Sequence, residues 1–432
     1  MSEAGSQAAP ARDGERLLDE LAEQPGGPEL LSLAADRDDV ALVGGAARDL
    51  LLGRVPRELD VVLGSGAAAP FARELARLLG GDSEGATVTI HSRFGTAAVD
   101  WPGGRVDIAE RRAESYPAPG ALPEVRPGSV EEDLARRDFT VNAIATPLGG
   151  RRRGMLDAVP QAIDDLAARR LRVLHDASFL DDPTRLLRLA RYGARLGFRA
   201  EERTAGLASE AIAAGALQTV SRARVGAELR LALSEDDPLP ALEAMQTLGV
   251  LGALDPALRF ETTPAGLALS LLPPDGRPDL MLLAQLLLGL APEGAVKERE
   301  RAMFALLDPL EFNAGDRDRT IRTALAAPGL VSALAPAPPP SQLHDALAHE
   351  TLEAVALAGA LGGEAATETA RCWLQTLRHV SLSITGQDLL DAGVPEGPQV
   401  GRRLTAALHR KLDGELADGR EAELRAALEA QP

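Results

Sequence analysis

The sequence predicts an α/β head with a mixed sheet, followed by an elongated all-α C-terminal half. Two observations carry this prediction. Short apolar runs typical of buried strands alternate with helical segments over about the first 160 residues. Beyond that point nearly every segment has apolar residues at the 3.6-residue spacing of a helix. A length of 432 residues is enough for two to four domains.

We expect five segments along the chain and a short connector between the last two. Residues 1–14 are small and polar, which predicts a disordered tail. Residues 334–341 are rich in proline, which predicts a stiff connector between helical bundles. The remaining segments are a head over residues 15–160, a helical neck over 161–235, a helical body over 236–333 and a helical tail over 342–432.

The elements of the head follow in chain order. An apolar run at residues 40–43 predicts a buried strand, and Gly44-Gly45 separate it from a helix over residues 46–52. Gly53 and Pro56 end that helix. Four further strands are expected at residues 59–63, 86–91, 96–100 and 105–109, and two further helices at residues 70–79 and 130–136.

The composition excludes several classes of protein. A single cysteine, Cys372, excludes a disulfide framework and a cysteine-rich zinc site. The sequence shows no signal peptide and no apolar run of about 18 residues, so we expect a cytoplasmic protein with no membrane partner. The net charge of −18 argues against nucleic acid, but residues 101–230 contain 21 arginines against 18 acidic residues. A locally basic middle can still follow a phosphate backbone.

The first candidate site is the glycine pair between the first strand and its helix. Two glycines let the backbone approach a ligand, and the free N–H groups at a helix start favour a phosphate. Arg48, one turn into the helix, could add a cation. By itself such a pair is more often simply the geometry of a tight turn.

Three carboxylates supply the context that the glycines need. Glu58 and Asp60 alternate along one strand, so both side chains project from the same face, and Asp107 lies within another predicted strand. Strands disfavour acidic residues, although each of these could alone be a surface position of an edge strand. Together, carboxylates on adjacent strands beside a phosphate-binding turn predict a Mg²⁺-dependent phosphoryl-transfer site, with Glu58 and Asp60 as metal ligands.

These residues resemble a known family signature. Gly44-Gly45, Arg48-Asp49 and Glu58-x-Asp60 resemble the DNA polymerase β nucleotidyltransferase superfamily, and most closely class II tRNA nucleotidyltransferases (CCA-adding enzymes) and bacterial poly(A) polymerases. Three further stretches are similar to motifs of that family in the same order: RRDFTVNAIA at 136–145, DDPTRLLRLARYGARLGF at 181–198 and ITGQDLLDAGVPEGPQVGRRL at 384–404. The resemblance spans roughly residues 38–430. It implies a nucleotidyltransferase head, a nucleotide-recognition neck and an RNA-binding tail.

The resemblance also implies roles for particular side chains. Asp182 and Arg185 would hydrogen-bond the edge of the incoming base in place of a template, since a carboxylate accepts from an amino group and a guanidinium donates to ring acceptors. Asp182 before Pro183 is also what a helix N-cap looks like, and both roles can hold. Arg188 is expected near the triphosphate, as are Arg136 and its neighbour Arg137, unless these two are only helix-end cations.

The Pro- and Gly-rich stretch over residues 111–130 is similar to the flexible loop that the family uses when it turns to ATP. Its full length favours an enzyme that can add A. The predicted activity is therefore addition of C, C and A to the tRNA 3′ end from CTP and ATP, with Mg²⁺ as cofactor. A-only or CC-only addition and poly(A) tailing remain alternatives. Because the family has Asp-x-Asp where this chain has Glu58-x-Asp60, an RNA-binding protein that has lost catalysis is a further alternative. The sequence indicates no oligomeric state.

Overall fold

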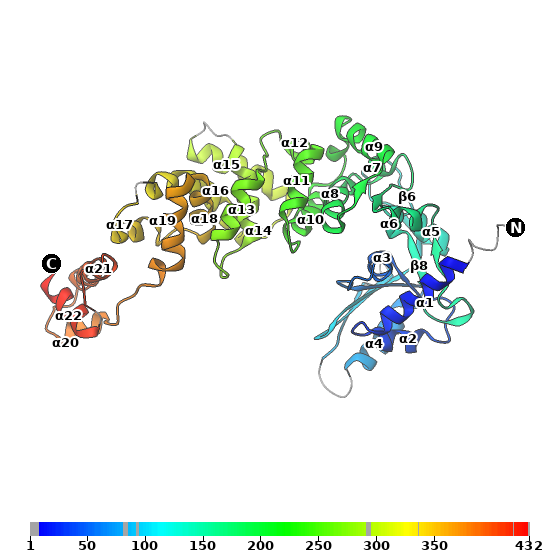
Figure 1. The fold of residues 1–432 in the computed structure, drawn as a ribbon, viewed down its shortest axis with the longest axis horizontal. Helices are drawn as coiled ribbons and strands as arrows, with labels where there is room; N and C mark the ends of the chain where they lie inside the picture. The colour runs from blue at the N-terminus through cyan, green and yellow to red at the C-terminus, as the bar shows by residue number, and fades with distance from the viewer. Residues whose placement is uncertain are drawn as a thin grey trace. The chain divides into compact units, whose positions relative to one another are not determined.

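The computed structural model describes residues 8–80, 85–91, 95–290, 295–335, 337–417 and 419–430. It divides into two compact units, Met1–Ser221 and Arg222–Pro432. The first contains every strand among the described residues, and the second is helical (Figure 1). The predicted fold class, a mixed-sheet head followed by a helical C-terminal half, is confirmed. The boundary between the units falls inside the predicted neck of residues 161–235, and the five-segment division stays a prediction.

A seven-stranded mixed sheet is the centre of the first unit. Its strands lie in the order β3-β4-β5-β2-β1-β8-β9. The β2–β5 pair is parallel, and the other neighbours are antiparallel. The strands are β1 (Ala41–Val43), β2 (Leu59–Leu63), β3 (Thr87–His91), β4 (Thr96–Trp101), β5 (Gly104–Glu110), β8 (Ile144–Pro147) and β9 (Asp157–Ala158).

The apolar content of these strands explains their place in the sheet. All three residues of β1 are buried, as are four of the five in β2, which suits strands with neighbours on both sides. The buried apolar residues of β1, β2 and β8 form one core cluster with Leu134. The four predicted strands after the first agree with β2 to β5 within one or two residues. The strands β8 and β9 were not predicted.

Helices and short turns complete the first unit. Helix α3 packs on β1, β2 and β8, and α4 packs on β3, β4 and β5. The helices are α1 (Ala8–Ala22), α2 (Gly27–Ala34), α3 (Gly44–Leu51), α4 (Ala68–Gly80), α5 (Val130–Ala135), α6 (Ala162–Ala167), α7 (Ser178–Asp181), α8 (Thr184–Leu196) and α9 (Glu202–Ala213), with the 3₁₀ turns η2 (Thr140–Asn142), η3 (Gly150–Arg152) and η4 (Ala216–Gln218). A two-stranded sheet pairs β10 (Arg170–Leu171) with β11 (Arg199–Ala200).

Two sequence expectations need correction here. The tail over residues 1–14 is not disordered from residue 8 onward, because α1 begins at Ala8 and buries Leu17, Leu18 and Leu21 against the head. Residues 1–7 lie outside the described residues. The loop over 111–130 is not irregular throughout, since β6 (Arg112–Ser115) pairs with β7 (Glu124–Pro127) as an antiparallel hairpin. All four residues of β7 are exposed, so the hairpin shows no apolar alternation that a sequence pattern could reveal.

The second unit consists of helices. They are α10 (Arg222–Leu233), α11 (Leu239–Leu248), α12 (Val250–Leu254), α13 (Thr262–Leu271), α14 (Pro278–Leu286), α15 (Val296–Leu307), α16 (Ala314–Leu334), α17 (Pro340–Leu347), α18 (Leu352–Leu361), α19 (Gly363–Gln375), α20 (Gly386–Asp391), α21 (Pro398–Leu412) and α22 (Arg420–Glu429), with the 3₁₀ turns η5 (Leu287–Gly289), η6 (Asp308–Leu310) and η7 (Leu377–His379). The predicted proline-rich connector falls where α16 ends and α17 begins. No helix in the described ranges is long and apolar enough to cross a membrane.

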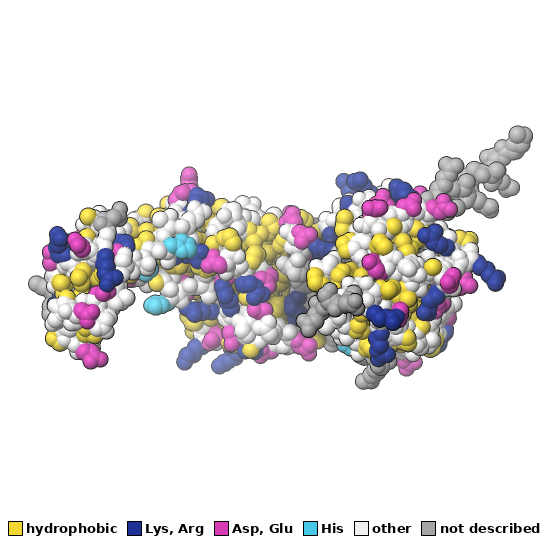
Figure 2. Space-filling model, turned by 90° about the horizontal axis from the view of Figure 1, so that it is seen from below, with side chains coloured by type: hydrophobic (Ala, Val, Ile, Leu, Met, Phe, Trp, Pro, Cys, Tyr) yellow, Lys and Arg dark blue, Asp and Glu magenta, His cyan; other side chains and the backbone are white. Residues whose placement is uncertain are grey.

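Polar contacts fix the last helices of this unit. Helices α20, α21 and α22 share a small core that includes Leu389, Ala407 and Ala426. Asp413, at the end of α21, accepts hydrogen bonds from the backbone N–H and the hydroxyl of Ser341 in α17, at 2.9 and 2.7 Å. On the face shown in Figure 2, basic and acidic side chains are interspersed over both units. The negative net charge is therefore not gathered into one acidic patch on that face.

Candidate active site

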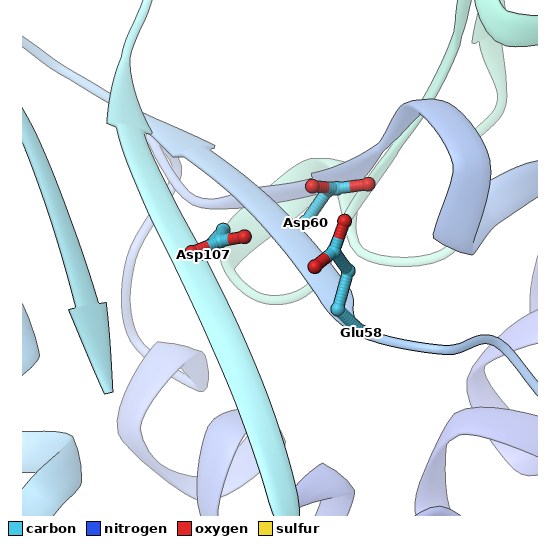
Figure 3. A group of neighbouring side chains, drawn as sticks. All are labelled: Glu58, Asp60 and Asp107. Carbon is cyan, nitrogen blue, oxygen red and sulfur yellow. The ribbon is translucent and has the colours of Figure 1, made fainter. Parts of the chain in front are cut away.

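Three carboxylates meet on the first unit's sheet. Glu58 directly precedes β2, Asp60 lies within β2, and Asp107 is the register partner of Asp60 on β5. Their side chains point toward one another (Figure 3), and one oxygen from each lies within 4.8 Å of the others. The parallel pairing of β2 with β5 brings Asp107 to the other two from nearly fifty residues away. The cluster predicted from the sequence is therefore present as a geometric group.

Electrostatics show that this cluster holds more negative charge than its surroundings neutralise. Burial and the charge of Glu58 raise the pKa of Asp60 to about 7, although the nearby Arg137 acts in the opposite direction. The pKa of Glu58 is also raised, first by burial of its carboxyl group and then by the charge of Asp107. A cation at this position would lower both values, because an opposite charge favours the ionised form.

One arginine already pairs with the outer side of the cluster. Arg105 donates to Asp107 at 3.0 Å and to Asp100 at 3.0 Å, and lies 4.0 Å from Glu58. Its side chain is 44% exposed, so solvent weakens this compensation. Arg105 was not predicted from the sequence. Its alternation with Asp107 along β5 is the signal that could have found it.

The residues fit a divalent metal ion. Three carboxylates supply hard oxygen ligands, which Mg²⁺ prefers, and their oxygens are close enough to share one ion. Two of the three have raised pKa values without a cation. The donor set and its uncompensated charge agree with the predicted Mg²⁺ ligands Glu58 and Asp60.

The turn at Gly44 lies directly beside the carboxylates. Gly44 has φ of 68°, and a Cβ atom there would lie 2.6 Å from Nη1 of Arg137 and 3.7 Å from a carboxylate oxygen of Asp60. The positive φ favours glycine here, and a side chain would also displace the Arg137 guanidinium from beside the turn. At Gly45 a Cβ would lie 3.7 Å from the same Asp60 oxygen, at ordinary contact distance. The turn predicted to bind phosphate therefore lies directly beside the carboxylates predicted to bind the metal.

Arg48 occupies a different environment from the one expected of a phosphate ligand. Its side chain is wholly buried beneath Gly45 and donates to Asp49 through Nε and Nη2, at 2.8 and 2.9 Å. Nη1 donates to Asn142 of η2. A direct contact with a nucleotide would require these bonds to break. In this structure Arg48 affects the site through its charge, which favours the ionised form of Asp60.

Arg136 and Arg137 follow α5 and share one carboxylate. Arg136 donates to Asp133 through Nε and Nη2, at 3.0 and 2.8 Å, and Arg137 donates to it through Nη2 at 3.0 Å. Of the two, Arg137 is the one that reaches Gly44. Nothing in the sequence indicated that one of these two arginines would lie nearer the turn than the other. Arg136 extends toward the hairpin and donates to Glu114 at 3.0 Å.

Arg188 joins α8 to the turn after α5. It donates through Nε and Nη2 to one oxygen of Asp138, at 2.8 and 2.6 Å. Burial would raise the pKa of Asp138, but the charge of Arg188 and hydrogen bonds from Asn142 and Arg188 outweigh it, and the pKa lies well below its usual value. Asp138 and Asn142 were not singled out from the sequence. Both lie within RRDFTVNAIA, where polar residues between buried apolar ones are the available signal.

Asp182 and Arg185 lie at the start of α8, as expected. The Asp182 carboxylate accepts from the backbone N–H of Thr184 at 3.0 Å and from its hydroxyl at 2.6 Å. It thus contacts the first turn of α8, but the N-cap is Pro183 and not Asp182 as the capping interpretation had it. Arg185 is buried and donates to the Ser178 hydroxyl and, at 2.9 Å, to the carbonyl of Arg136. The pair is thus connected to the segment that holds Arg137.

The hairpin lies close to that pair. Tyr116 donates its hydroxyl to Glu114 at 3.2 Å. Burial raises the pKa of Tyr116 to about 12, and the charges of Arg185 and Asp182 also act on it. The backbone N–H of Gly120 donates to the carbonyl of Leu180 in α7, at 3.0 Å. The structure therefore places the predicted loop next to the residues expected to choose the base.

Tyr192 is a further residue that the sequence analysis missed. Four guanidinium groups lie within 5.6 Å of its ring centre: those of Arg48, Arg188, Arg191 and Arg195. The ring also meets Phe139 edge to face, with 6.1 Å between centroids. The arginine stripe of α8 is thus packed around an aromatic ring, which stabilises cations placed over its face.

Comparison with known proteins agrees with this geometry. Residues 40–172 match the family model of the poly A polymerase head domain. A CC-adding tRNA nucleotidyltransferase of Deinococcus radiodurans is 32% identical over 433 residues, covering 97% of this chain and 98% of that protein. An A-adding tRNA nucleotidyltransferase of Geobacter sulfurreducens is 38% identical over 261 residues, or 59% of this chain, but the match covers 29% of its own length.

The coverage of the A-adding relatives is partial. The matches to three of them cover between 25% and 50% of those proteins' own length. A solved structure of the Thermotoga maritima CCA-adding enzyme complexed with tRNA has a TM-score of 0.75 and 26% identity, over 96% of this chain and 97% of that one. The Deinococcus match covers nearly all of both sequences at 32% identity, and the chain therefore belongs to the tRNA nucleotidyltransferase family.

Proposed function

We propose that this protein adds C, C and A to the 3′ end of tRNA, using CTP and ATP and a divalent metal, and that it does so in the cytoplasm. One observation carries the proposal: the Glu58, Asp60 and Asp107 cluster lies against the Gly44 turn with Arg137 beside it. This combination suits transfer of a nucleotide from a triphosphate. The solved relative bound to tRNA and the relatives named for CC and A addition support tRNA as the substrate.

The proposed reaction assigns a task to each side chain. Glu58 and Asp60 hold the metal, and Gly44 leaves room for the triphosphate, to which Arg137 donates. Bound Mg²⁺ would neutralise charge on the triphosphate and favour ionisation of the RNA 3′-hydroxyl. The hydroxyl oxygen attacks the α-phosphorus, the bond to the bridging oxygen breaks, and pyrophosphate leaves. Asp107 orients the hydroxyl, whose proton passes to a carboxylate or to water.

Base choice is assigned to the start of α8. Asp182 and Arg185 would present an acceptor and donors to the edge of the incoming base. Tyr116 of the hairpin lies close to Asp182 and Arg185, so movement of the hairpin would change how these two side chains meet the base. Recognition of tRNA by shape and backbone is assigned to the helical second unit, in the manner usual for structured RNA.

Two narrower activities, A-only addition and CC-only addition, are each supported by some of the relatives. The A-adding relatives match 49% to 59% of this chain at 38% to 40% identity, which favours A-only addition. The relative matched over its full length is a CC-adding protein, which favours CC-only addition. The ordered hairpin argues for an enzyme that adds A, as the sequence resemblance implied.

One experiment separates these alternatives. The protein is incubated with Mg²⁺ and three tRNAs that lack the whole CCA end, its last two nucleotides or only the final A, with CTP and ATP supplied singly and together. Extension of all three to the mature end is expected. Extension of the third alone would establish A-only addition, and a stop after CC would establish CC-only addition.

The same assay tests the two remaining alternatives, poly(A) tailing and loss of catalysis. Repeated A addition to an unrelated RNA would establish poly(A) tailing. If no tRNA is extended while tRNA still binds, the protein is an RNA-binding member that has lost catalysis. An Asp60→Ala protein, tested in parallel, must show no incorporation, because otherwise the activity would come from a contaminant.

A further inference from the structure

A buried carboxylate outside the metal cluster connects the hairpin to the triphosphate side of the site. Asp133, in α5, is 1% exposed. Its Oδ1 accepts from the backbone N–H of Arg112 at 3.3 Å and from Arg136, while its Oδ2 accepts from Arg137 at 3.0 Å. Burial would raise the pKa of Asp133, but the charges of Arg137 and Arg136 outweigh it and the pKa is lowered. Asp133 is therefore an ionised anchor for two arginines.

The two oxygens of Asp133 are divided unequally between the arginines. Arg136 directs both Nε and Nη2 to Oδ1, instead of taking both oxygens in the usual side-by-side arrangement. This leaves Oδ2 to Arg137. The remaining terminal nitrogen of Arg136, Nη1, donates to Glu114 of the hairpin at 3.0 Å.

Glu114 is itself firmly held. Its side chain is 6% exposed, and it accepts from Arg112 at 2.9 Å and from the Tyr116 hydroxyl at 3.2 Å. Glu114 thus fixes the orientation of the Arg136 guanidinium from the side opposite Asp133. If Glu114 moved away, Arg136 could turn and take both oxygens of Asp133, displacing Arg137.

Arg137 is the residue that this arrangement positions. Nη2 is anchored on Asp133, whereas Nη1 lies 2.6 Å from where a Cβ of Gly44 would be, and the charge of Arg137 acts on Asp60. Nε is buried and has no hydrogen-bond partner among the described residues. The anchor on Asp133 therefore holds the guanidinium beside Gly44.

We propose that Asp133 is a positioning residue that directs Arg137 at the triphosphate, and that Glu114 of the hairpin controls this through Arg136. The inference rests on the proposed function, because it assumes a nucleoside triphosphate at Gly44. It makes the hairpin a regulator of triphosphate binding as well as a neighbour of the base. The path runs through named contacts: Glu114 to Arg136, Arg136 to Asp133, and Asp133 to Arg137.

Equilibrium binding tests this without depending on catalysis. Titration calorimetry with Mg²⁺ and inorganic tripolyphosphate, and separately with ATP and CTP, is applied to full-length Asp133→Asn, Glu114→Gln and the double variant. Loss of a residue that orients a ligand group typically costs about 10- to 100-fold in affinity. We expect a loss in that range for Asp133→Asn with all three ligands, and a smaller loss for Glu114→Gln.

The double variant tests the path. If Glu114 acts through Asp133, adding Glu114→Gln to Asp133→Asn causes no further loss of tripolyphosphate affinity. Losses that multiply would overturn the path through Asp133. An Asp133→Asn protein that binds tripolyphosphate as tightly as wild type would overturn the positioning role.

A matched control removes the effect of stability. Asp165 is also fully buried and accepts from Arg172 at 2.8 and 3.2 Å and from Thr140 at 2.8 Å, but it lies on α6 and holds no residue that reaches Gly44. Asp165→Asn should lower the melting temperature and leave tripolyphosphate affinity within about twofold of wild type. An equal loss of affinity in both variants would assign the effect of Asp133 to the fold. If wild type binds tripolyphosphate but extends no tRNA, the proposed function fails while this comparison remains decisive.

Discussion

Burial and a neighbouring carboxylate disfavour the charged form of Asp60. The pKa of Asp60 is raised to about 7 chiefly by burial and by Glu58, so its ionised form is unfavourable when no cation is present. Catalytic groups are commonly held in environments that disfavour their charged form. A bound ligand then offsets the free energy that this charge costs in the folded protein. The same property makes the site measurable through stability.

Asp60→Asn should therefore separate stability from activity. At pH 8 with chelator, the variant should be more stable than wild type, by on the order of 1 to 4 kcal/mol, because a shift of about three pKa units is removed. Incorporation of nucleotides should be lost. Chemical denaturation and a primer-extension assay measure the two. A variant that is less stable than wild type in chelator would show that Asp60 is well accommodated without metal.

The pH dependence of the metal-free protein has a definite sign. Between about pH 4 and 7, folded Asp60 keeps its proton while the unfolded chain has lost it, so the free energy of unfolding falls as pH rises. Because a metal ligand must be deprotonated, Mg²⁺ affinity should fall by up to about tenfold per pH unit below pH 7. Melting curves in chelator and Mg²⁺ titrations at pH 5.5 to 8 measure both trends. Asp60→Asn should lack the first trend, and a wild type that shows none contradicts the assignment.

Among the elements, α8 and its start hold several of the residues predicted to bind the nucleotide. Its first turn holds Asp182 and Arg185, and Arg188 and Tyr192 connect it to the turn around Asp138 and Asn142. Arg185 is 4% exposed and already donates to Ser178 and Arg136. The same guanidinium could therefore select the base or stabilise α8 through its hydrogen bonds to Ser178 and Arg136, a role called the brace below.

Arg185→Ala distinguishes the two roles. Removal of donors to the base edge should reduce discrimination against UTP and GTP by roughly 5- to 150-fold, corresponding to about 1–3 kcal/mol for a bidentate contact. Loss of the buried hydrogen bonds should also lower the melting temperature. Misincorporation assays and melting curves are compared with Arg185→Lys, which keeps one charge but not the fork. Unchanged selectivity with a large loss of stability would leave the brace as its only role.

Some elements could be predicted from sequence and others could not, for physical reasons. The apolar runs of β1 to β5 and the alternation of Glu58 with Asp60 are local signals, and the structure confirms the elements they indicated. The β6–β7 hairpin has no local signal, because β7 is exposed throughout. Burial of Arg48 and the approach of Arg137 to Gly44 depend on residues about 90 positions apart. Such contacts arise only once β1 and β8 are paired.

For the whole molecule, net charge is a poor guide to its partner. The protein carries a net charge of −18, yet 21 of its arginines lie within residues 101–230. Several of them are engaged with carboxylates or with Tyr192. Binding of RNA would therefore depend on local clusters rather than on a uniformly basic surface.

The salt dependence of tRNA binding tests whether local arginine clusters contact the RNA phosphates. The affinity for tRNA should fall steeply between about 50 and 200 mM salt, with a logarithmic slope that reflects the number of phosphates neutralised. Fluorescence anisotropy of labelled tRNA measures the slope, and unlabelled DNA of equal length serves as competitor. A flat dependence over this range would mean that arginine–phosphate contacts contribute little to binding.

The pairing of Asp60 with Asp107 on two adjacent strands has a consequence for the size of ion that the site accepts. Both carboxylates are attached to backbone that the β2–β5 ladder holds in register, whereas Glu58 lies outside the strand on a longer side chain. Ca²⁺ needs bonds of about 2.3–2.6 Å and six to eight ligands, against about 2.0–2.1 Å and octahedral geometry for Mg²⁺. Because the ladder fixes the ligand Asp60 against Asp107, the site cannot widen on that side. Ca²⁺ should therefore bind mainly through Glu58 and water and support incorporation at least about tenfold more slowly. Competition between the two ions in the extension assay measures this ionic-radius selectivity, and equal rates would show a cavity that adapts its coordination number.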